Sequence, residues 1–308
     1  MSNETAILAL DAGQTGIRSV LVTEGNRVEG NFNGLRTDLE LFPQLAQVIK
    51  SEIAKAPGSV QLAIGMTGLT HSESKPAELL QSLDEKVISV HLAHDSITGF
   101  LGSMGLNLGT VTAVGTGVVT LAVGKTEMAR VDGWGNLIGD AGSAYWIGRA
   151  GLEAAMRSYD GRIPRSKLET LLESFSHPEE TYIELQTNDN RVSVIASFAR
   201  AVIELAETDS TAREIVEQAG AELARSAVTA ARRVGLLEQD APRFSWAGNV
   251  IKSELLKNSF MKLISSEVQN SSFQEPIAEP IDGVVLLPNL PEDSPLRAVV
   301  HTAERVKA

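Results

Sequence analysis

Short apolar runs alternate along the first third of the chain with segments of helical period. The apolar runs at residues 5–10, 17–22, 60–66 and 87–93 predict strands, and residues 27–33 predict a weaker one. Residues 39–56 carry large apolar side chains on one helical face, with Thr37 or Asp38 as the expected cap. A shorter helix is expected at 75–83. This order predicts hairpin-linked strands followed by right-handed crossovers.

The pattern partly repeats after residue 108. Strands are expected at 110–114 and 118–123, joined by the turn Gly115-Thr116-Gly117, and again at 244–247 and 284–287. Helices are expected at 144–159 with Ser143 as N-cap, and at 165–175, 192–207, 212–234 and 253–268. The sequence therefore predicts an α/β fold with an N-terminal domain at 1–107, to which a closing helix at 295–307 returns, and a C-terminal domain at 108–294.

Composition and charge narrow the possible partners. The 308 residues are 43% hydrophobic, which is ordinary for a globular protein. With 27 Lys and Arg against 39 Asp and Glu, the net charge is −12, and no basic run is interleaved with aromatic residues. We therefore expect no nucleic-acid partner. No apolar stretch approaches the ~20 residues that cross a bilayer, so we expect no membrane association and a cytoplasmic location.

The absence of cysteine excludes several kinds of chemistry. A chain without cysteine carries no disulfide, thiolate nucleophile or cysteine-ligated iron–sulfur cluster. The five histidines show no metal-ligand spacing, so a structural zinc site is not expected.

Glycine-rich turns are the strongest chemical signal in the sequence. Gly115-Thr116-Gly117 and the stretch DAGQT at 11–15 place a small hydroxyl residue among glycines, where backbone N–H groups can approach an anion closely. Taken alone, a Gly-Thr-Gly hairpin is more often an ordinary turn than a binding site. Between Asp132 and Ser143, further glycine turns, one acidic side chain and a helix start favour a site for phosphate and a polyol.

Four motifs together carry a resemblance to a known family. Along the chain they are DAGQT at 11–15, GTG at 115–117, GWGNLIGDAGSAYWI at 133–147 and AGNVIKS at 247–253. In this order they resemble the BadF/BadG/BcrA/BcrD ATPase family, and within it the N-acetylglucosamine kinases of the sugar kinase, Hsp70 and actin superfamily. The resemblance implies two ribonuclease H-like (actin-like ATPase) domains flanking a cleft for nucleotide and sugar. It also implies a homodimer.

The resemblance assigns roles to particular residues. ATP would be bound by Gly13, Gln14, Thr15, Gly115, Thr116, Gly117, Gly248, Asn249 and Lys252, although Lys252 is equally compatible with a plain surface lysine. Asp11 would be the Mg²⁺ partner through water, with a turn-forming aspartate as its alternative. Asp95 would be the catalytic base, with a helix cap as its alternative. The sugar would be bound by Asp38, Thr67, Asp95, Gly133 and Asp140.

Three departures from the family pattern concern the substrate more than the reaction. The first loop carries Ala12 and Gln14 where glycines are common, Ala141 replaces a glutamate, and Asp38 stands where an amide is usual. We therefore expect an ATP- and Mg²⁺-dependent sugar kinase that phosphorylates the 6-hydroxyl of N-acetylglucosamine, or else glucosamine or another hexose.

Two other classes of protein share this fold. The ATPases that activate radical dehydratases hold a cysteine-ligated iron–sulfur cluster, which a chain without cysteine cannot bind. A non-catalytic module that senses nucleotide and sugar remains the alternative, and an absence of sugar-stimulated ATP turnover would favour it.

Overall fold

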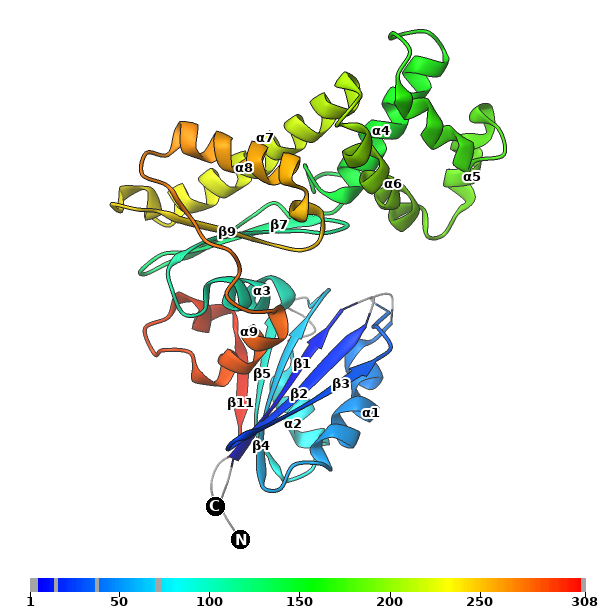
Figure 1. Ribbon diagram of the computed structural model, residues 1–308. Coiled ribbons are helices and arrows are strands. Elements are labelled where there is room, and N and C mark those ends of the chain that lie inside the picture. The colour runs from blue at the N-terminus through cyan, green and yellow to red at the C-terminus, as the bar shows by residue number, and fades with distance from the viewer. Residues whose placement is uncertain (1–4, 14–15, 37–38, 70–73, 306–308) are drawn as a thin grey trace. The chain divides into compact units, whose positions relative to one another are not determined.

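The chain forms two compact α/β units, seen in a computed structural model that describes residues 5–13, 16–36, 39–69 and 74–305 (Figure 1). The first unit comprises Met1–Leu108, Val123–Met128 and Glu275–Ala308. The second comprises Gly109–Ala122 and Ala129–Gln274. Residues 275–294, which we expected in the C-terminal domain, pack with the first unit.

A six-stranded mixed sheet forms the centre of the first unit, in the order β11-β5-β4-β1-β2-β3. The strands are β1 (Thr5–Ala12), β2 (Ile17–Thr23), β3 (Asn26–Phe32), β4 (Ser59–Met66), β5 (Val87–His94) and β11 (His301–Glu304). β1 pairs with β2 antiparallel and with β4 parallel, and β4 pairs with β5 parallel. Met66 lies opposite both Ala12 and His94, so the carboxyl ends of β1, β4 and β5 are level.

Two helices cover one face of this sheet, as the hydrophobic pattern predicts. They are α1 (Leu41–Ile53) and α2 (Pro76–Ser82). Leu45 and Ile49 of α1 are fully buried in the same core cluster as Leu8 and Leu10 of β1. Burying each such side chain contributes about 1.5–3 kcal/mol. α1 begins at Leu41 with Glu40 as its N-cap, later than predicted, and its expected caps at 37 and 38 lie outside the described residues.

The opposite face of the sheet carries α3 (Asp95–Met104) and α9 (Pro280–Leu286). The strand predicted at 284–287 is wrong, because that apolar run belongs largely to α9. Pro280 occupies the first turn, and Glu279 and Asp282 form a capping box that starts a helix. α9 packs tightly on α3, since a Cβ on Gly283 would lie 2.0 Å from the Thr98 carbonyl oxygen.

The closing helix predicted at 295–307 is also wrong. A short 3₁₀ helix, η6 (Pro295–Val299), precedes β11, which pairs antiparallel with β5 at the edge of the sheet. The Arg305 guanidinium then donates hydrogen bonds to the carbonyl oxygens of Leu80, Leu83 and Val87. The open edge of β5 supplies backbone partners that local helix propensity does not anticipate.

The second unit contains a five-stranded sheet in the order β10-β9-β6-β7-β8. Its strands are β6 (Gly109–Val114), β7 (Val118–Val123), β8 (Met128–Val131), β9 (Arg243–Ala247) and β10 (Ser272–Phe273). β9 pairs parallel with both β6 and β10. This order repeats β5-β4-β1-β2-β3 of the first unit, so the two halves share one sheet topology, as the repeated sequence pattern suggested.

Helices make up the remainder of the second unit. They are α4 (Ala144–Tyr159), α5 (Thr181–Thr187), α6 (Arg191–Leu205), α7 (Ser210–Arg233) and α8 (Glu254–Glu267), with the 3₁₀ turns η1 (Lys167–Ser174), η2 (Pro178–Glu180), η3 (Leu236–Glu238) and η4 (Val250–Lys252). A further 3₁₀ turn, η5 (Leu287–Asn289), follows α9 in the first unit. The α-helix predicted at 165–175 is thus a 3₁₀ helix. Ser143 and Ser253 cap α4 and α8 with their side chains, which confirms the start predicted for each.

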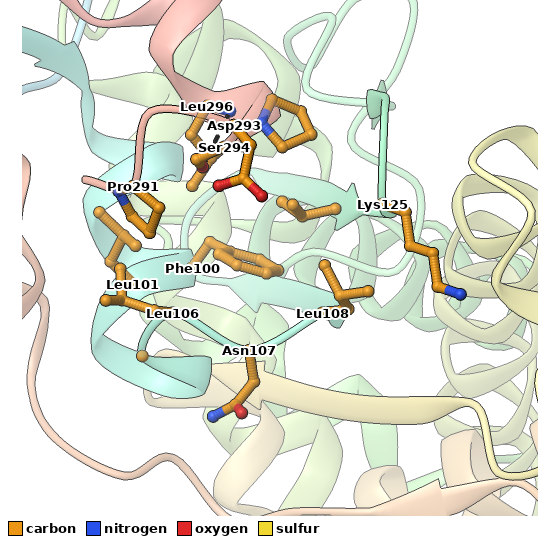
Figure 2. A pocket seen from close by; sticks show the side chains of 13 residues that line it. Phe100, Leu101, Leu106, Asn107, Leu108, Lys125, Pro291, Asp293, Ser294 and Leu296 are labelled. Carbon is orange, nitrogen blue, oxygen red and sulfur yellow. Dashed lines mark hydrogen bonds between the residues drawn. The ribbon is translucent and has the colours of Figure 1, made fainter.

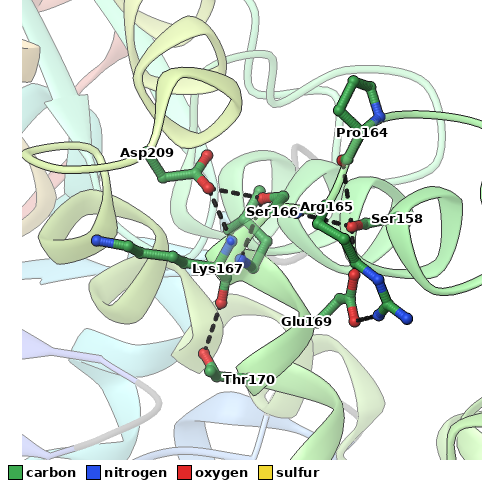
Figure 3. A network of polar contacts seen from close by, with 9 residues as sticks. Ser158, Pro164, Arg165, Ser166, Lys167, Glu169, Thr170 and Asp209 are labelled. Carbon is green, nitrogen blue, oxygen red and sulfur yellow. Dashed lines mark hydrogen bonds and ion pairs between the residues drawn. The ribbon is translucent and has the colours of Figure 1, made fainter.

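A polar network joins η1 to the start of α7 (Figure 3). Asp209 caps α7 by accepting from the Ala212 N–H at 2.9 Å, and its second oxygen accepts from the Ser166 hydroxyl at 2.9 Å and the Lys167 N–H at 2.8 Å. These bonds hold the pKa of Asp209 below its usual range although burial raises it. One carboxylate therefore fixes both segments.

α7 is long but charged. It spans 24 residues with alanine-rich packing on one side and arginine and glutamate side chains on the other. Over the part of the chain that the structure describes, no helix combines the length and the apolar character needed to cross a membrane.

Candidate functional site

Three of the predicted site residues lie at the carboxyl edge of the sheet in the first unit. Asp11 is near the end of β1, Thr67 directly follows β4, and Asp95 directly follows β5. Because these strands are parallel neighbours with level ends, the fold brings together residues that are far apart in sequence. The Thr67 N–H donates to the Ala12 carbonyl oxygen at 3.1 Å, which fixes the first two strand ends to each other.

Asp95 is the first residue of α3, but it is not the N-cap of that helix. His94 is the N-cap, and its Nδ1 lies 3.1 Å from the Ser96 backbone nitrogen. The Asp95 carboxylate, 41% exposed, lies 2.9 Å from the same Nδ1. His94 thus occupies the cap position that we considered for Asp95, although the Asp95 carboxylate also accepts a hydrogen bond from the Ser96 N–H.

The Asp95 carboxylate is ready to act as an ionised group. Burial raises its pKa, but the hydrogen bond and the charge of His94 lower the pKa. Further hydrogen bonds from the Thr67 side chain and the Ser96 N–H act in the same direction, and together they hold the pKa below its usual range. At neutral pH this carboxylate is an acceptor with no proton of its own.

Asp11 has the opposite electrostatic character. Burial and the nearby charge of Asp95 raise the pKa of Asp11 from its ordinary 3.8 to about 6, and Glu279 adds to the effect. Arg18, opposite Asp11 on β2, lowers the pKa but is itself paired with Glu279 at 2.5 Å. The first unit thus presents two carboxylates whose charges repel each other, an arrangement that favours a cation.

The residues around Asp11 fit Mg²⁺ in one particular manner. No group of three or more His, Cys, Asp or Glu side chains in the described segments could hold a metal ion alone. Mg²⁺ typically keeps several waters and uses one or two carboxylates together with substrate phosphates. A half-buried carboxylate such as Asp11, whose ionisation is opposed by the nearby charge of Asp95, meets that requirement.

At the first glycine turn, the structure describes Gly13 and Gly16. The Gly13 N–H donates to the Gly16 carbonyl oxygen at 3.0 Å, and the Gly13 carbonyl accepts from the Leu35 N–H at 2.9 Å. Gln14, Thr15 and Asp38, which we expected to bind nucleotide or sugar, lie outside the described residues.

The second glycine turn, in the second unit, is joined to the start of α4. The Gly115 N–H donates to the Gly117 carbonyl oxygen at 2.9 Å. The carbonyl oxygens of Gly115 and Thr116 accept from the N–H groups of Ala144 and Tyr145 at 2.9 and 3.1 Å. The turn is therefore held by the first turn of the helix, and those helical N–H groups are already used.

Asp140 lies directly against this turn. Its carboxylate accepts hydrogen bonds from the N–H groups of Val118 and Gly135, and burial raises its pKa despite them. A Cβ on Gly117 would lie 2.6 Å from Asp140 Oδ2. Gly117 thus admits the acidic side chain that we expected to bind sugar.

Asp132 is an organising residue that the sequence reasoning treated only as part of a loop. Its Oδ1 accepts from the N–H groups of Gly133 and Asp140, both at 2.8 Å, and its Oδ2 accepts from the Ala141 N–H at 3.1 Å. An aspartate directly before a conformationally free glycine was the available signal.

Gly133 has both backbone groups engaged. Its N–H donates to Asp132 and its carbonyl oxygen accepts from the Arg130 guanidinium, which also lies 5.2 Å from the centre of the Trp134 ring. A carbonyl oxygen has two lone pairs, so one of them remains for a ligand.

The loop after β9 approaches the second glycine turn closely. Gly248 has a φ of +94°, and a Cβ there would lie 2.3 Å from the Val114 carbonyl oxygen. Only glycine fits this position without strain. The next residue, Asn249, is exposed, and so is Lys252 at the end of η4. The structure thus places these three predicted nucleotide residues on one surface loop, beside the end of β6.

A separate cavity of about 150 Å³ lies elsewhere in the first unit (Figure 2). Phe100, Leu101 and Asn107 line one part of it, and Pro291, Asp293 and Leu296 line another. None of its described lining residues belongs to the predicted site, so this cavity is distinct from the carboxylate pair.

Comparison with known proteins gives a consistent result. The sequence profile of the BadF/BadG/BcrA/BcrD ATPase family matches residues 9–285. An N-acetylmuramic acid/N-acetylglucosamine kinase from Clostridium acetobutylicum is 28% identical over 244 residues, covering 74% of this chain and 78% of that protein. An N-acetyl-D-glucosamine kinase from Dictyostelium discoideum is 26% identical over 238 residues, covering 73% and 74%.

Solved structures share the fold. A proposed N-acetylglucosamine kinase from Chromobacterium violaceum superposes with a TM-score of 0.71 at 22% identity, over 92% of this chain and 98% of that one. A protein of the same description from Porphyromonas gingivalis gives 0.71 at 17% identity, over 91% and 98%. These similarities confirm the two-unit α/β fold.

Proposed function

Because the chain belongs to the BadF/BadG/BcrA/BcrD ATPase family, we propose that it is an ATP-dependent kinase of N-acetylglucosamine or a closely related amino sugar. The observation that supports this most is the carboxylate pair at the ends of β1 and β5, the two strands that flank β4, where the pKa of Asp11 is raised and that of Asp95 is lowered. Two carboxylates whose pKa values are shifted in opposite directions suit two different tasks.

Asp95 acts in this proposal as the catalytic base. Its carboxylate accepts the proton of the sugar's 6-hydroxyl while that oxygen attacks the γ-phosphorus. The O–H bond breaks, the new O–P bond forms, and the bond from the γ-phosphorus to ADP breaks. The low pKa of Asp95 keeps the carboxylate ionised and able to accept the proton at neutral pH.

Asp11 and the glycine turns hold the nucleotide in this proposal. Mg²⁺, when bound with ATP, neutralises charge that develops on the phosphates. Asp11 would hold the ion through water, and the backbone of the turns at Gly13 and Gly115–Gly117 would lie near the phosphates. Gln14 and Thr15 complete the first turn, and Gly248, Asn249 and Lys252 are assigned to the adenosine.

The sugar site would combine Asp38, Thr67, Gly133 and Asp140 with Asp95. Asp140 serves this role through an oxygen not saturated by the Val118 and Gly135 N–H groups, since a carboxylate offers about four acceptor positions. N-acetylglucosamine is the first choice because both relatives described above carry it in their names. We also propose that the active form is a homodimer.

The test is ADP release from Mg·ATP with a panel of sugars, using wild type, Asp95→Asn and Asp240→Asn. Asp240 is an exposed aspartate in the second unit, so its substitution is a chemically matched control. We expect one N-acetylamino sugar to stimulate turnover, Asp95→Asn to lose at least about a hundredfold, and the control to stay unchanged. Product analysis by NMR identifies the phosphorylated oxygen.

Tight ATP binding without turnover for any sugar would refute the kinase and favour the sensing module. Full activity in Asp95→Asn would refute the assignment of the base.

A further inference from the structure

The histidine before the proposed base makes three short contacts through one ring nitrogen. His94 is the last residue of β5, with a side chain 29% exposed. Its Nδ1 lies 2.9 Å from Asp95 Oδ1, 2.9 Å from the Ser96 hydroxyl oxygen and 3.1 Å from the Ser96 backbone nitrogen. These contacts make conflicting demands on that nitrogen.

One proton decides between two roles for His94. A bare Nδ1 accepts the Ser96 N–H and serves as the helix cap, whereas a protonated Nδ1 donates to Asp95. A bare nitrogen would place its lone pair 2.9 Å from an ionised carboxylate oxygen with no proton between them, which is repulsive. The Ser96 N–H does not depend on His94, because the Asp95 carboxylate also accepts it.

We propose that His94 is a positioning residue, which donates from Nδ1 to Asp95 Oδ1 and thereby holds the catalytic carboxylate ionised and correctly oriented. This inference rests on the kinase function proposed above. The Thr67 side chain supplies a second hydrogen bond from the neighbouring strand end. Donors from β4 and β5 then fix the carboxylate between them, so that it need not reorient when substrate binds.

His94 touches neither substrate nor the transferred phosphate in this mechanism. The proton leaving the sugar hydroxyl goes to Asp95, and His94 keeps its own proton. The other charged group facing Asp95 is Asp11, which in turn faces Arg18 and Glu279. The negative charge of Asp11 opposes ionisation of Asp95, so the donor on His94 offsets it.

The two roles predict opposite tautomers, which NMR distinguishes in the wild-type protein. Long-range ¹H–¹⁵N correlation spectra at pH 8 report which ring nitrogen carries the proton, and His94→Asn identifies the signal among the five histidines. We expect the proton on Nδ1. A proton on Nε2 alone would overturn the proposal and leave His94 as a helix cap.

Kinetics test the same point independently. Serine and asparagine are both good N-caps, so His94→Ser and His94→Asn should fold with unfolding midpoints near that of wild type. Serine is too short to reach the Asp95 carboxylate while it caps the helix, whereas the asparagine amide can still donate. We expect kcat to fall about ten- to a hundredfold in His94→Ser, with an unchanged KM for ATP. The acid limb of the kcat/KM profile should move to higher pH, and His94→Asn should recover most of the activity.

Wild-type kcat and an unmoved acid limb in His94→Ser would overturn the inference, provided that Asp95→Asn is inactive. Retained turnover in Asp95→Asn would instead refute the proposed base, and with it any role for His94 in positioning that base. The two failures are therefore distinguishable.

Discussion

The ionised Asp11 carboxylate should make the ligand-free protein less stable than a variant with an uncharged side chain at this position. Burial and the charge of Asp95 raise the pKa of Asp11 to about 6, so ionising the carboxylate in the folded protein costs free energy that the unfolded chain does not incur. Asp11→Asn keeps the size of the side chain and removes the charge. We expect the variant to be more stable and inactive.

The size and pH dependence of this effect follow from the pKa change. A native pKa of about 6 against an unfolded value of 3.8 destabilises the ionised protein by about 3 kcal/mol at pH 7. The native state binds the proton more tightly, so the cost is absent below about pH 3.8 and grows as the pH rises. It levels off above about pH 6. At pH 5 the advantage of Asp11→Asn should be about half of its value at pH 7.

Urea unfolding of the metal-free protein at pH 5 and pH 7.5 measures the difference directly. Asp240→Asn makes the same chemical change at an exposed position and should alter stability by less than about 0.5 kcal/mol. Adding Mg·ATP should stabilise wild type more than Asp11→Asn, because the cation relieves the repulsion only where the charge exists. A variant that is less stable than wild type at both pH values would refute the reasoning.

Three further substitutions test the supporting structure. Gly248→Ala should lower the melting temperature and weaken ATP binding, because a Cβ would strike the Val114 carbonyl. Gly161→Ala is the control: Gly161 has a φ of +82° and no atom within 4 Å of the added Cβ, so this substitution measures only the cost of a positive φ in a residue other than glycine. Equal losses in both variants would contradict the close approach. Asp132→Ala leaves three N–H groups without their acceptor, so sugar-dependent kcat/KM should fall while ATP binding persists; an unchanged value would argue against its organising role. Asp209→Ala should cost about 1–2 kcal/mol in urea unfolding, while Asp209→Asn, which can still cap the helix, should cost less. Because the pKa of Asp209 is lowered, the stability that its ionised carboxylate contributes is complete above about pH 4 and is lost as the pH falls below that value. If Asp209→Ala remained equally destabilising in acid, this explanation would be wrong.

The sequence by itself indicated many of the local elements and the residues proposed for the candidate site. Glycine turns, helix caps such as Ser143, and short apolar strands depend on neighbours within a few residues, so their pattern can be recognised in the sequence. The resemblance of four motifs indicated the family, and the partly repeated strand pattern predicted two α/β halves; the comparisons and the fold confirm both.

Only the tertiary structure decided the features that depend on distant partners. The segment at 301–304 is a strand because β5 has an open edge, and the run at 284–287 lies largely in a helix because α9 packs on α3 through glycine. Likewise, the chain does not reveal that Asp11 has a raised pKa while that of Asp95 is lowered. Proton affinity depends on burial and on charges from other strands, and these exist only once β1, β4 and β5 end side by side.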